Sequence, residues 1–281
     1  MGVLLTSQNG LAPCENGDPY EPGENQGLIQ VAYSGVSPAD VKYGQQLGLN
    51  DRVTGYEFSG TVAKAGPGFP YAVGDEVFGL RRLDLGSRFG EHQDWLIAEG
   101  NSLLAKRPST LPKDAAAGML VALRTAVDAL IDILGFHVLE ITGSDSALGC
   151  AAIQIAKAAG VNLIIAITDP SYYQILLDLG AHRSLDEDYY KLLPEIRQII
   201  DDHPEVEKMD YLDCKGTEFT TTKCVELRRD DHEYDEMVVS NLPISGRKAS
   251  WIWCAYPWLG YESASTHRSY TLIRACGANP G

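Results

Sequence analysis

From position 138 to 214 the sequence alternates short apolar runs with longer segments of helical character, and this alternation restricts the fold more than any other feature. The runs predict strands at 138–142, 162–167 and 209–214, and the segments between them predict helices ending at Ala159, Leu179 and Ile200. Strands that alternate with helices favour a parallel sheet covered by helices. Because ligands of such sheets bind at the carboxyl ends of the strands, we expect a doubly wound α/β sheet with a site at that edge.

The region before residue 110 or so has a different texture. Short apolar runs such as Gly27–Tyr33 and Glu57–Val62 are separated by glycine and proline, which is typical of short strands and predicts a small barrel or sandwich. The texture changes at Lys113. The stretch 114–134 contains no proline and predicts a helix that opens the second region.

Charge and residue patterns narrow the classes of partner. Lys and Arg number 23 against 38 Asp and Glu, a formal net charge of −15 that disfavours nucleic acids and anionic membranes. No apolar run approaches the roughly 18 residues of a membrane span, and the start lacks the basic residues of a secretory signal, so a cytoplasmic protein is expected. The six cysteines contain no C-x-x-C pair and the six histidines lack metal-ligand spacing, so no metal site is predicted.

The segment Ile141–Gly149 joins the first of the parallel strands to its helix. A dinucleotide pyrophosphate approaches main-chain N–H groups only where side chains are small and a helix amino terminus points at it. Two glycines frame the segment, and serine and alanine stand where the motif G-x-G-x-x-G has its middle glycine. A tight turn without a ligand is the alternative. The cofactor-binding residues predicted here are Gly143, Ser144, Ser146, Ala147, Leu148 and Gly149.

Five further motifs stand in a fixed order along the chain, GVSPADVK at 35–42, GYEFSG at 55–60, VGDEVFG at 73–79, FGE at 89–91 and ALRTA at 122–126. Together with the 143–149 turn they resemble the zinc-independent medium-chain dehydrogenase/reductase family, most of all its fungal trans-acting enoyl reductases of polyketide biosynthesis. The likeness covers residues 1 to about 216. It implies a GroES-like β-rich amino-terminal domain and a Rossmann-type parallel sheet.

The resemblance also implies domain boundaries. We expect a GroES-like catalytic and substrate domain over 1–128, a Rossmann-like dinucleotide-binding domain over 129–240, and a diverged carboxyl-terminal segment over 241–281. Beyond Thr217 the strands that should flank the nicotinamide are not recognisable, and the stretch 251–258 has no family counterpart. A shortened or diverged carboxyl-terminal part is therefore predicted.

Three residues are implied as catalytic. Zinc-dependent relatives bind their metal through a Cys and a His where this chain has Ser37 and Tyr56, so no catalytic zinc is expected. In an enoyl reductase, negative charge builds on the thioester oxygen, which needs a cation or donor beside it. Lys42 and Thr125 match the positions of active-site polar groups, and Tyr56 is a candidate proton donor. A solvated lysine, a helical threonine bonded to its own backbone and a structural tyrosine are the alternatives.

The residues after the second parallel strand bear on the choice of cofactor. Thr168, Asp169, Ser171 and Tyr173 are the predicted contacts, and Asp169 suits a ribose diol better than a 2′-phosphate. The resemblance implies NADPH, with NADH possible because of Asp169. The run Asp210–Gly216 resembles the family's fourth-strand motif, with an ordinary buried strand edge as the alternative.

Three functions remain open from the sequence. The first is an NAD(P)H-dependent enoyl reductase that acts on a free or carrier-bound thioester beside a polyketide synthase. The second is a degenerate, non-catalytic family member that binds a synthase, and the third is a quinone or enone reductase.

Glu140 is a charged residue midway along a strand that should be buried. Its carboxylate must find a partner, reach the surface or reduce stability.

Overall fold

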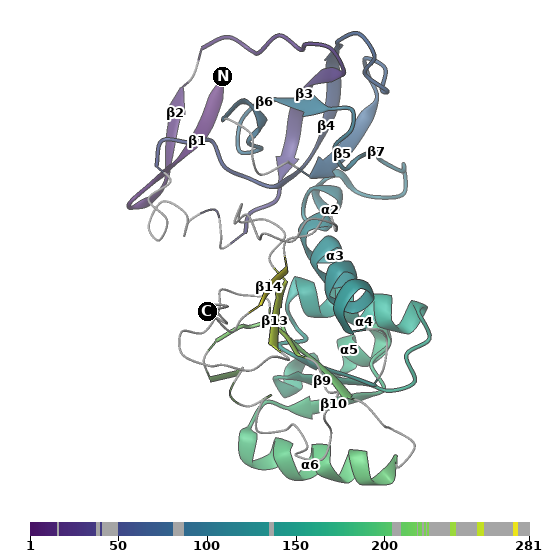
Figure 1. Ribbon diagram of the computed structural model, residues 1–281. Coiled ribbons are helices and arrows are strands. Elements are labelled where there is room, and N and C mark those ends of the chain that lie inside the picture. The colour runs from purple at the N-terminus through teal and green to yellow at the C-terminus, as the bar shows by residue number, and fades with distance from the viewer. Residues whose placement is uncertain are drawn as a thin grey trace, which may run out of the picture. The chain divides into compact units, whose positions relative to one another are not determined.

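The computed structural model describes the chain except residues 16, 38–39, 41–49, 81–86, 135–137, 204–208, 218, 221, 223, 225–236, 240–251, 256–271 and 275–281. The chain divides into two compact units, Met1–Val121 and Ala122–Gly281 (Figure 1). Helix α3 (Leu120–Val127) runs through this division, so the boundary predicted at residue 128 lies at the far end of the same helix.

The amino-terminal unit is built on antiparallel strands. Its main sheet has the spatial order β6-β3-β4-β5-β7, with strands β3 (Gln26–Ser34), β4 (Glu57–Ala65), β5 (Glu76–Leu80), β6 (Trp95–Glu99) and β7 (Leu104–Lys106). A hairpin of β1 (Gly2–Ser7) and β2 (Gly10–Glu15) accompanies it. The predicted strands at 27–33 and 57–62 are confirmed, and the side chains buried in the core of this sheet are Ile29, Phe58, Val62, Val77, Leu96 and Ala98.

The helix predicted over 114–134 is interrupted. Helix α2 (Lys113–Ala117) ends at Gly118, whose N–H donates to the Ala115 carbonyl oxygen, and α3 begins two residues later. Residues Asp128–Leu134 then continue as a π-helix. Glycine is a poor helix former, so Gly118 is where the continuous helix expected from the missing prolines breaks.

The carboxyl-terminal unit contains the doubly wound sheet. Its strand order is β10-β9-β8-β11-β12-β13-β14, and every pairing is parallel except that of β13 with β14. The strands are β8 (Val138–Thr142), β9 (Ile164–Thr168), β10 (Arg183–Asp186), β11 (Met209–Asp213), β12 (Met237–Val239), β13 (Ile252–Ala255) and β14 (Leu272–Arg274). The predicted α/β fold class is confirmed.

Helices cover the sheet on both faces (Figure 1). Leu139 and Ile141 of β8 pack in one cluster with α4 (Ala147–Ala158) and α5 (Tyr173–Leu179), which follows a short 3-10 turn at Pro170–Tyr172. Val138 belongs to a second cluster with α6 (Tyr189–Asp202). Because successive side chains of a strand point to opposite faces, β8 and β9 contribute apolar side chains to both clusters, as their apolar runs predict.

Four strands of the carboxyl-terminal unit were not predicted from the sequence. Strand β10 has four residues, of which Leu185 alone is buried, so it shows no apolar run. Strands β12, β13 and β14 have three or four residues each, too few for a period to be recognised. Strand β13 lies inside 251–258, which we could not assign, and it extends the parallel sheet.

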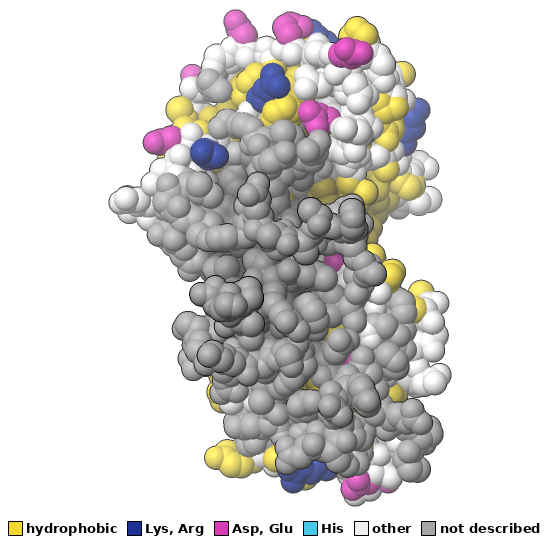
Figure 2. All heavy atoms as spheres, in the orientation of Figure 1, with side chains coloured by type: hydrophobic (Ala, Val, Ile, Leu, Met, Phe, Trp, Pro, Cys, Tyr) yellow, Lys and Arg dark blue, Asp and Glu magenta, His cyan; other side chains and the backbone are white. Residues whose placement is uncertain are grey.

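Charged side chains are dispersed over the visible part of the amino-terminal unit rather than gathered in one basic patch (Figure 2). Among the described helices, none combines the length and apolarity that a membrane span requires.

Candidate functional site

The carboxyl ends of β8, β9, β10 and β11 meet at one edge of the parallel sheet, and nearly all of the predicted cofactor residues lie there. The chain continues from β8 to β9 and β10 on one side, and then returns to place β11 on the other side of β8. Such a reversal of strand order opens a crevice beside the first strand, and ligands of doubly wound sheets bind in that crevice.

Both glycines of the β8–α4 turn are required by its geometry. Gly143 has φ of +72°, a left-handed conformation that favours glycine. A Cβ on Gly149 would stand 2.5 Å from the Ser144 Cα, so the start of α4 lies directly against the turn. The roles expected from the sequence, a tight turn at Gly143 and close packing at Gly149, are both present.

Main-chain amides at the start of α4 are the open donors of this turn. The N–H groups of Gly143 and Ser144 donate to the Ile167 carbonyl, and that of Ser146 donates to the Gly143 carbonyl. The N–H groups of Ala147 and Leu148 make no hydrogen bond among the described residues. A helix leaves its first amides unpaired and carries partial positive charge there, so these two groups can bind an anion.

The two serines of the turn are used by the protein itself. Ser146 caps α4, and its hydroxyl accepts from the Gly149 N–H at 3.1 Å. The buried Ser144 hydroxyl donates to the Ile141 carbonyl and accepts from the Ile167 N–H at 3.1 Å, which ties β8 to β9. Ser144 therefore has a structural role in the turn. The carboxylate of the exposed Asp145 adds negative charge beside the open amides.

The end of β9 brings the other predicted contacts together. Asp169 caps the 3-10 turn, and its Oδ1 accepts from the Ser171 hydroxyl at 2.6 Å and from the Ser171 N–H at 2.9 Å. These bonds lower the pKa of Asp169. Thr168 is fully buried, and its hydroxyl has no hydrogen-bond partner among the described residues. Partial burial, followed by the charge of Asp186, raises the pKa of Tyr173.

A lysine after β11 lies across the glycine turn. The aliphatic chain of Lys215 passes over Gly143, with Cγ 2.7 Å from the point where a Cβ on that glycine would stand. Its ammonium group donates to the carboxylate of Glu187, which directly follows β10. The Asp213 carboxylate fixes this lysine's backbone by accepting from the N–H groups of Lys215 and Gly216 at 3.0 and 2.9 Å.

Glu140 lies inside the sheet rather than at the surface. It is fully buried, and its Oε1 accepts from the Thr142 hydroxyl at 2.8 Å. Burial, with a smaller contribution from the charge of Asp213, raises the pKa of Glu140 to about 8. The buried Cys224 thiol also interacts with this carboxyl group, and its own pKa is raised well above the ordinary value by burial. Of the outcomes open from the sequence, Glu140 has found partners.

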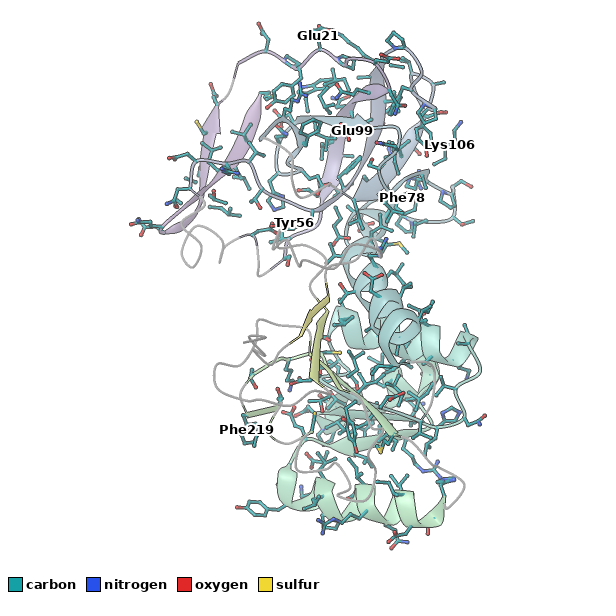
Figure 3. All side chains as sticks on the ribbon, viewed as in Figure 1. Glu21, Tyr56, Phe78, Glu99, Lys106 and Phe219 are labelled. Atoms are coloured by element: carbon teal, nitrogen blue, oxygen red, sulfur yellow. The ribbon has the colours of Figure 1, made fainter. Side chains whose placement is uncertain are left out.

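The predicted catalytic residues fall in different parts of the chain. Lys42 lies outside the described residues. Tyr56 precedes β4 in the amino-terminal unit (Figure 3) and is buried. Thr125 lies in α3 of the carboxyl-terminal unit and is also buried. Their meeting in one site stays a prediction.

A buried polar network, which the sequence did not reveal, lies on both sides of the segment that carries Lys42. The Asp40 carboxylate accepts from the Ser37 N–H at 2.7 Å and from the Thr54 hydroxyl at 2.9 Å. Its Oδ2 is 3.3 Å from His92 Nε2, and His92 Nδ1 is 2.8 Å from the Ser34 hydroxyl. These contacts tie the start of the segment, Ser37, to its end, Thr54.

Within the part of the chain that the structure describes, no three His, Cys, Asp or Glu side chains are placed to hold a metal ion. Independence from zinc stays a prediction from Ser37 and Tyr56. Three residues at this edge of the sheet were not predicted from the sequence, namely Asp145, Glu187 and Lys215. Lys215 belongs to the 210–216 run that resembles the family's fourth-strand motif, but the run does not indicate where the lysine side chain lies.

Residues 23–90 match the family model of the alcohol dehydrogenase GroES-like domain. The chain is 26% identical over 206 residues to the trans-enoyl reductase pgmF of Aspergillus terreus, which covers 68% of this chain and 56% of that protein. It is 28% identical over 176 residues to the chloroplastic NADPH-dependent alkenal/one oxidoreductase of Arabidopsis thaliana, covering 58% of this chain and 45% of that protein. The chain spans about half the length of the curated relatives it matches.

Solved structures share the fold. An alcohol dehydrogenase superfamily protein from Novosphingobium aromaticivorans superposes with a TM-score of 0.70 at 24% identity, over 85% of this chain and 72% of that one. The crotonyl-CoA carboxylase/reductase AntE, solved in complex with NADP, gives a TM-score of 0.66 at 18% identity, over 86% of this chain and 75% of that one. The resemblance stated from the sequence motifs is confirmed.

Proposed function

We propose that the chain, which resembles the medium-chain dehydrogenase/reductase superfamily, is an oxidoreductase that uses a nicotinamide dinucleotide. The observation that carries this proposal is the pair of open amides at Ala147 and Leu148, which begin α4 directly after the left-handed Gly143. Small side chains and a helix amino terminus are what a pyrophosphate needs. The residues present therefore fit the group.

The other predicted contacts have separate parts in this proposal. Gly143 and Gly149 give the turn its shape, and Ser146 caps the helix. Ser144 holds β8 and β9 in place from beneath, without touching the cofactor. Thr168, Asp169, Ser171 and Tyr173 surround the adenosine ribose at the end of β9. NADPH is the proposed cofactor, with NADH left open by the carboxylate of Asp169.

We assign the substrate to α,β-unsaturated thioesters, which makes the protein a trans-acting enoyl reductase. The dinucleotide supplies a hydride from its nicotinamide C4 to the β-carbon. Lys42 and Thr125 stabilise the negative charge that develops on the thioester oxygen, and Tyr56 delivers the proton to the α-carbon. The likeness to trans-enoyl reductases pgmF and himH supports this choice.

A polyketide synthase that presents the thioester on its carrier domain is the proposed partner. The match to a reducing polyketide synthase of Cochliobolus heterostrophus, 34% identical over 148 residues but covering 6% of that protein, is consistent with this setting. A cytoplasmic location is part of the proposal.

Two other functions have their own support. The acidic side chains of Asp145, Asp169 and Glu187 disfavour an anionic ligand, and they support a non-catalytic family member that binds a synthase. The likeness to the Arabidopsis alkenal/one oxidoreductase supports reduction of small enones or quinones. A dinucleotide-binding measurement distinguishes the non-catalytic family member from the proposed enoyl reductase. The range of substrates that are reduced distinguishes an enone or quinone reductase from it.

The test begins with binding. NADPH and NADH are titrated into the full chain while tryptophan fluorescence is recorded, and saturation below the millimolar range is expected for at least one. A crotonyl thioester is then added with each dinucleotide, and the nicotinamide absorbance band is followed. Lys42→Ala and Thr125→Val are expected to lower kcat at least tenfold with dinucleotide affinity unchanged, the loss of one general-acid or oxyanion contact. No saturable signal with either dinucleotide would leave only the non-catalytic role.

A further inference from the structure

We propose that Lys215 is the ligand of the 2′-phosphate of NADPH, and that Glu187 is the partner of this lysine when no dinucleotide is bound. The inference rests on the proposed function and deepens it, because it names the residue that sets the choice between NADPH and NADH.

The backbone of Lys215 is held at the edge where the dinucleotide would lie. Asp213 ends β11, and its Oδ1 accepts from the N–H groups of Lys215 and Gly216. The other oxygen of the same carboxylate accepts from the Thr220 hydroxyl at 2.8 Å. Asp213 is fully buried, so the start of the lysine side chain is fixed by a buried anchor and not by the surface.

The path of the side chain runs over the pyrophosphate turn. Measured from the Cβ that Gly143 lacks, the Lys215 Cγ, Cε and Cδ stand at 2.7, 3.4 and 3.5 Å. A Cβ at position 143 would therefore force the lysine side chain to shift from this path. The absence of a side chain at Gly143 lets the turn adopt its left-handed conformation and also gives Lys215 room to cross.

The ammonium group ends where the adenosine ribose is expected. It donates to Glu187 after β10, and its charge contributes to lowering the pKa of Asp169 after β9. In doubly wound folds an acidic residue at the end of the second strand binds the ribose 2′-hydroxyl, and a nearby cation accommodates a 2′-phosphate. Asp169 and Lys215 are thus the two candidates, of opposite charge, for one position on the cofactor.

The charges at this edge decide which cation is available. Lys191 also lies here, but it is paired with Asp186 at 2.8 Å and with Asp188 at 3.7 Å at the start of α6. A phosphate dianion next to Asp169 is repelled unless a cation compensates, whereas a ribose diol is not. Lys215 extends from the end of β11 over Gly143 to Glu187 after β10, and this path places its charge where it can compensate the phosphate. Its charge also contributes to lowering the pKa of Asp169.

Exchange of partners is physically easy. The side chains of Lys215 and Glu187 are 36% and 48% exposed, and pairs this exposed contribute little to stability because water screens them. A phosphate dianion binds an ammonium group more strongly than one carboxylate does, since it carries more charge and more acceptor oxygens. Release of Glu187 would accompany the entry of NADPH and would not be needed for NADH.

The experiment compares three variants of the full chain by their dissociation constants for NADPH and NADH, measured by fluorescence without substrate. Lys215→Met keeps the aliphatic stem and removes the charge; NADPH affinity is expected to fall about tenfold, the size of one charge-assisted contact, with NADH changed less than about twofold. Lys191→Met is the matched control, expected to leave the ratio of the two affinities unchanged. Glu187→Gln is expected to tighten NADPH about threefold by freeing Lys215.

Each outcome decides the matter. An NADPH to NADH affinity ratio that is unchanged in Lys215→Met overturns the assignment while the proposed function stands. If neither dinucleotide binds to the unmodified chain, both the assignment of Lys215 and the proposed function are overturned. If Lys215→Met fails to fold, Glu187→Gln tests the same pair from its other end, and an NADPH affinity that is unchanged in Glu187→Gln overturns the assignment. Lys215→Arg keeps the charge and should retain the NADPH preference.

Discussion

Glu140 is the residue at which physical chemistry and fold conflict most. It stands in the middle of β8, fully buried, where a charged carboxylate is strongly disfavoured. Thr142 satisfies one of its oxygens, but the carboxylate of Asp213 on the neighbouring strand opposes its ionisation. Because burial raises the pKa of Glu140 to about 8, this side chain is neutral in the folded protein at pH 7.

Stability should therefore depend on pH through Glu140. With a folded pKa near 8 and an ordinary value of 4.5, the folded state holds a proton that the unfolded state releases. Between these two values stability falls as pH rises, by up to about 1.4 kcal/mol per unit, and it is constant in this respect below 4.5 and above 8. Urea unfolding at pH 5.5, 7 and 8.5 measures this slope.

The variant Glu140→Gln is the control for that slope. Glutamine keeps the acceptor for Thr142 and carries no titratable proton, so it should remove most of the fall and should be more stable than the parent at pH 8.5. An equal slope in both proteins would show that Glu140 is ionised in the fold.

Among the elements, the β8–α4 turn depends on glycine for two different reasons. Gly143 is needed for its left-handed φ of +72°, and Gly149 for the approach of α4 to Ser144. Both reasons are local, which is why the spacing of the two glycines was readable without a structure. Ser146 replaces the middle glycine and compensates by capping the helix, a role that its residue type favours.

Gly149→Ala tests the close approach. The added methyl group would stand 2.5 Å from the Ser144 Cα and 2.7 Å from its carbonyl oxygen, both main-chain atoms that cannot move aside alone. We expect a loss of about 1–3 kcal/mol in the free energy of unfolding, the usual effect of overpacking, and weaker dinucleotide binding. Gly118→Ala is the control, because a Cβ there meets no atom closer than 3.9 Å and φ is −120°. Equal stability of the two variants would contradict the packing argument.

The elements that could be predicted are those with long apolar runs. Strands β8, β9 and β11 are buried at all five positions, and each contains enough apolar residues to be found, although β8 includes Glu140 and β11 includes Asp210 and Asp213. Strand β10 could not be found, because at the sheet's edge it buries only Leu185. The break at Gly118 could not be predicted, because a stretch without proline favours a continuous helix and a single glycine does not by itself indicate where a helix ends.

The site divides in the same way. The turn glycines and Asp169 lie in short segments whose local sequence pattern identifies them, so they could be predicted without the structure. Lys215 and Glu187 are 28 residues apart, and they meet only because β10 and β11 end at the same edge with β8 and β9 between them. No local pattern carries that information, since it depends on the order of strands in the sheet.

On the scale of the whole molecule, the proposed site residues are divided between two units that each have a core. The open amides of α4 and the proposed ribose contacts lie in the carboxyl-terminal unit, and Tyr56 and the Asp40–His92 network lie in the amino-terminal unit. A dinucleotide that binds as proposed should therefore protect amides from hydrogen exchange mainly at the sheet edge of the carboxyl-terminal unit; this protection is called the footprint. The same footprint is expected from a binding-competent but inactive family member, so it reports on the cofactor site independently of turnover.

Amide hydrogen exchange measures that footprint. A ligand present at 100 times its dissociation constant stabilises the folded state by about 2.7 kcal/mol, which slows the exchange of amides that open only on unfolding. Beyond this general effect, the amides of Ala147 and Leu148 should gain protection directly, because they are open in the free protein and would donate to the phosphates. Amides of β1 and β2, which form a separate hairpin, should change least. Adenosine is the control ligand, since it has no phosphate to occupy the start of α4, and protection at Ala147 equal with adenosine and with NADPH would place the pyrophosphate elsewhere.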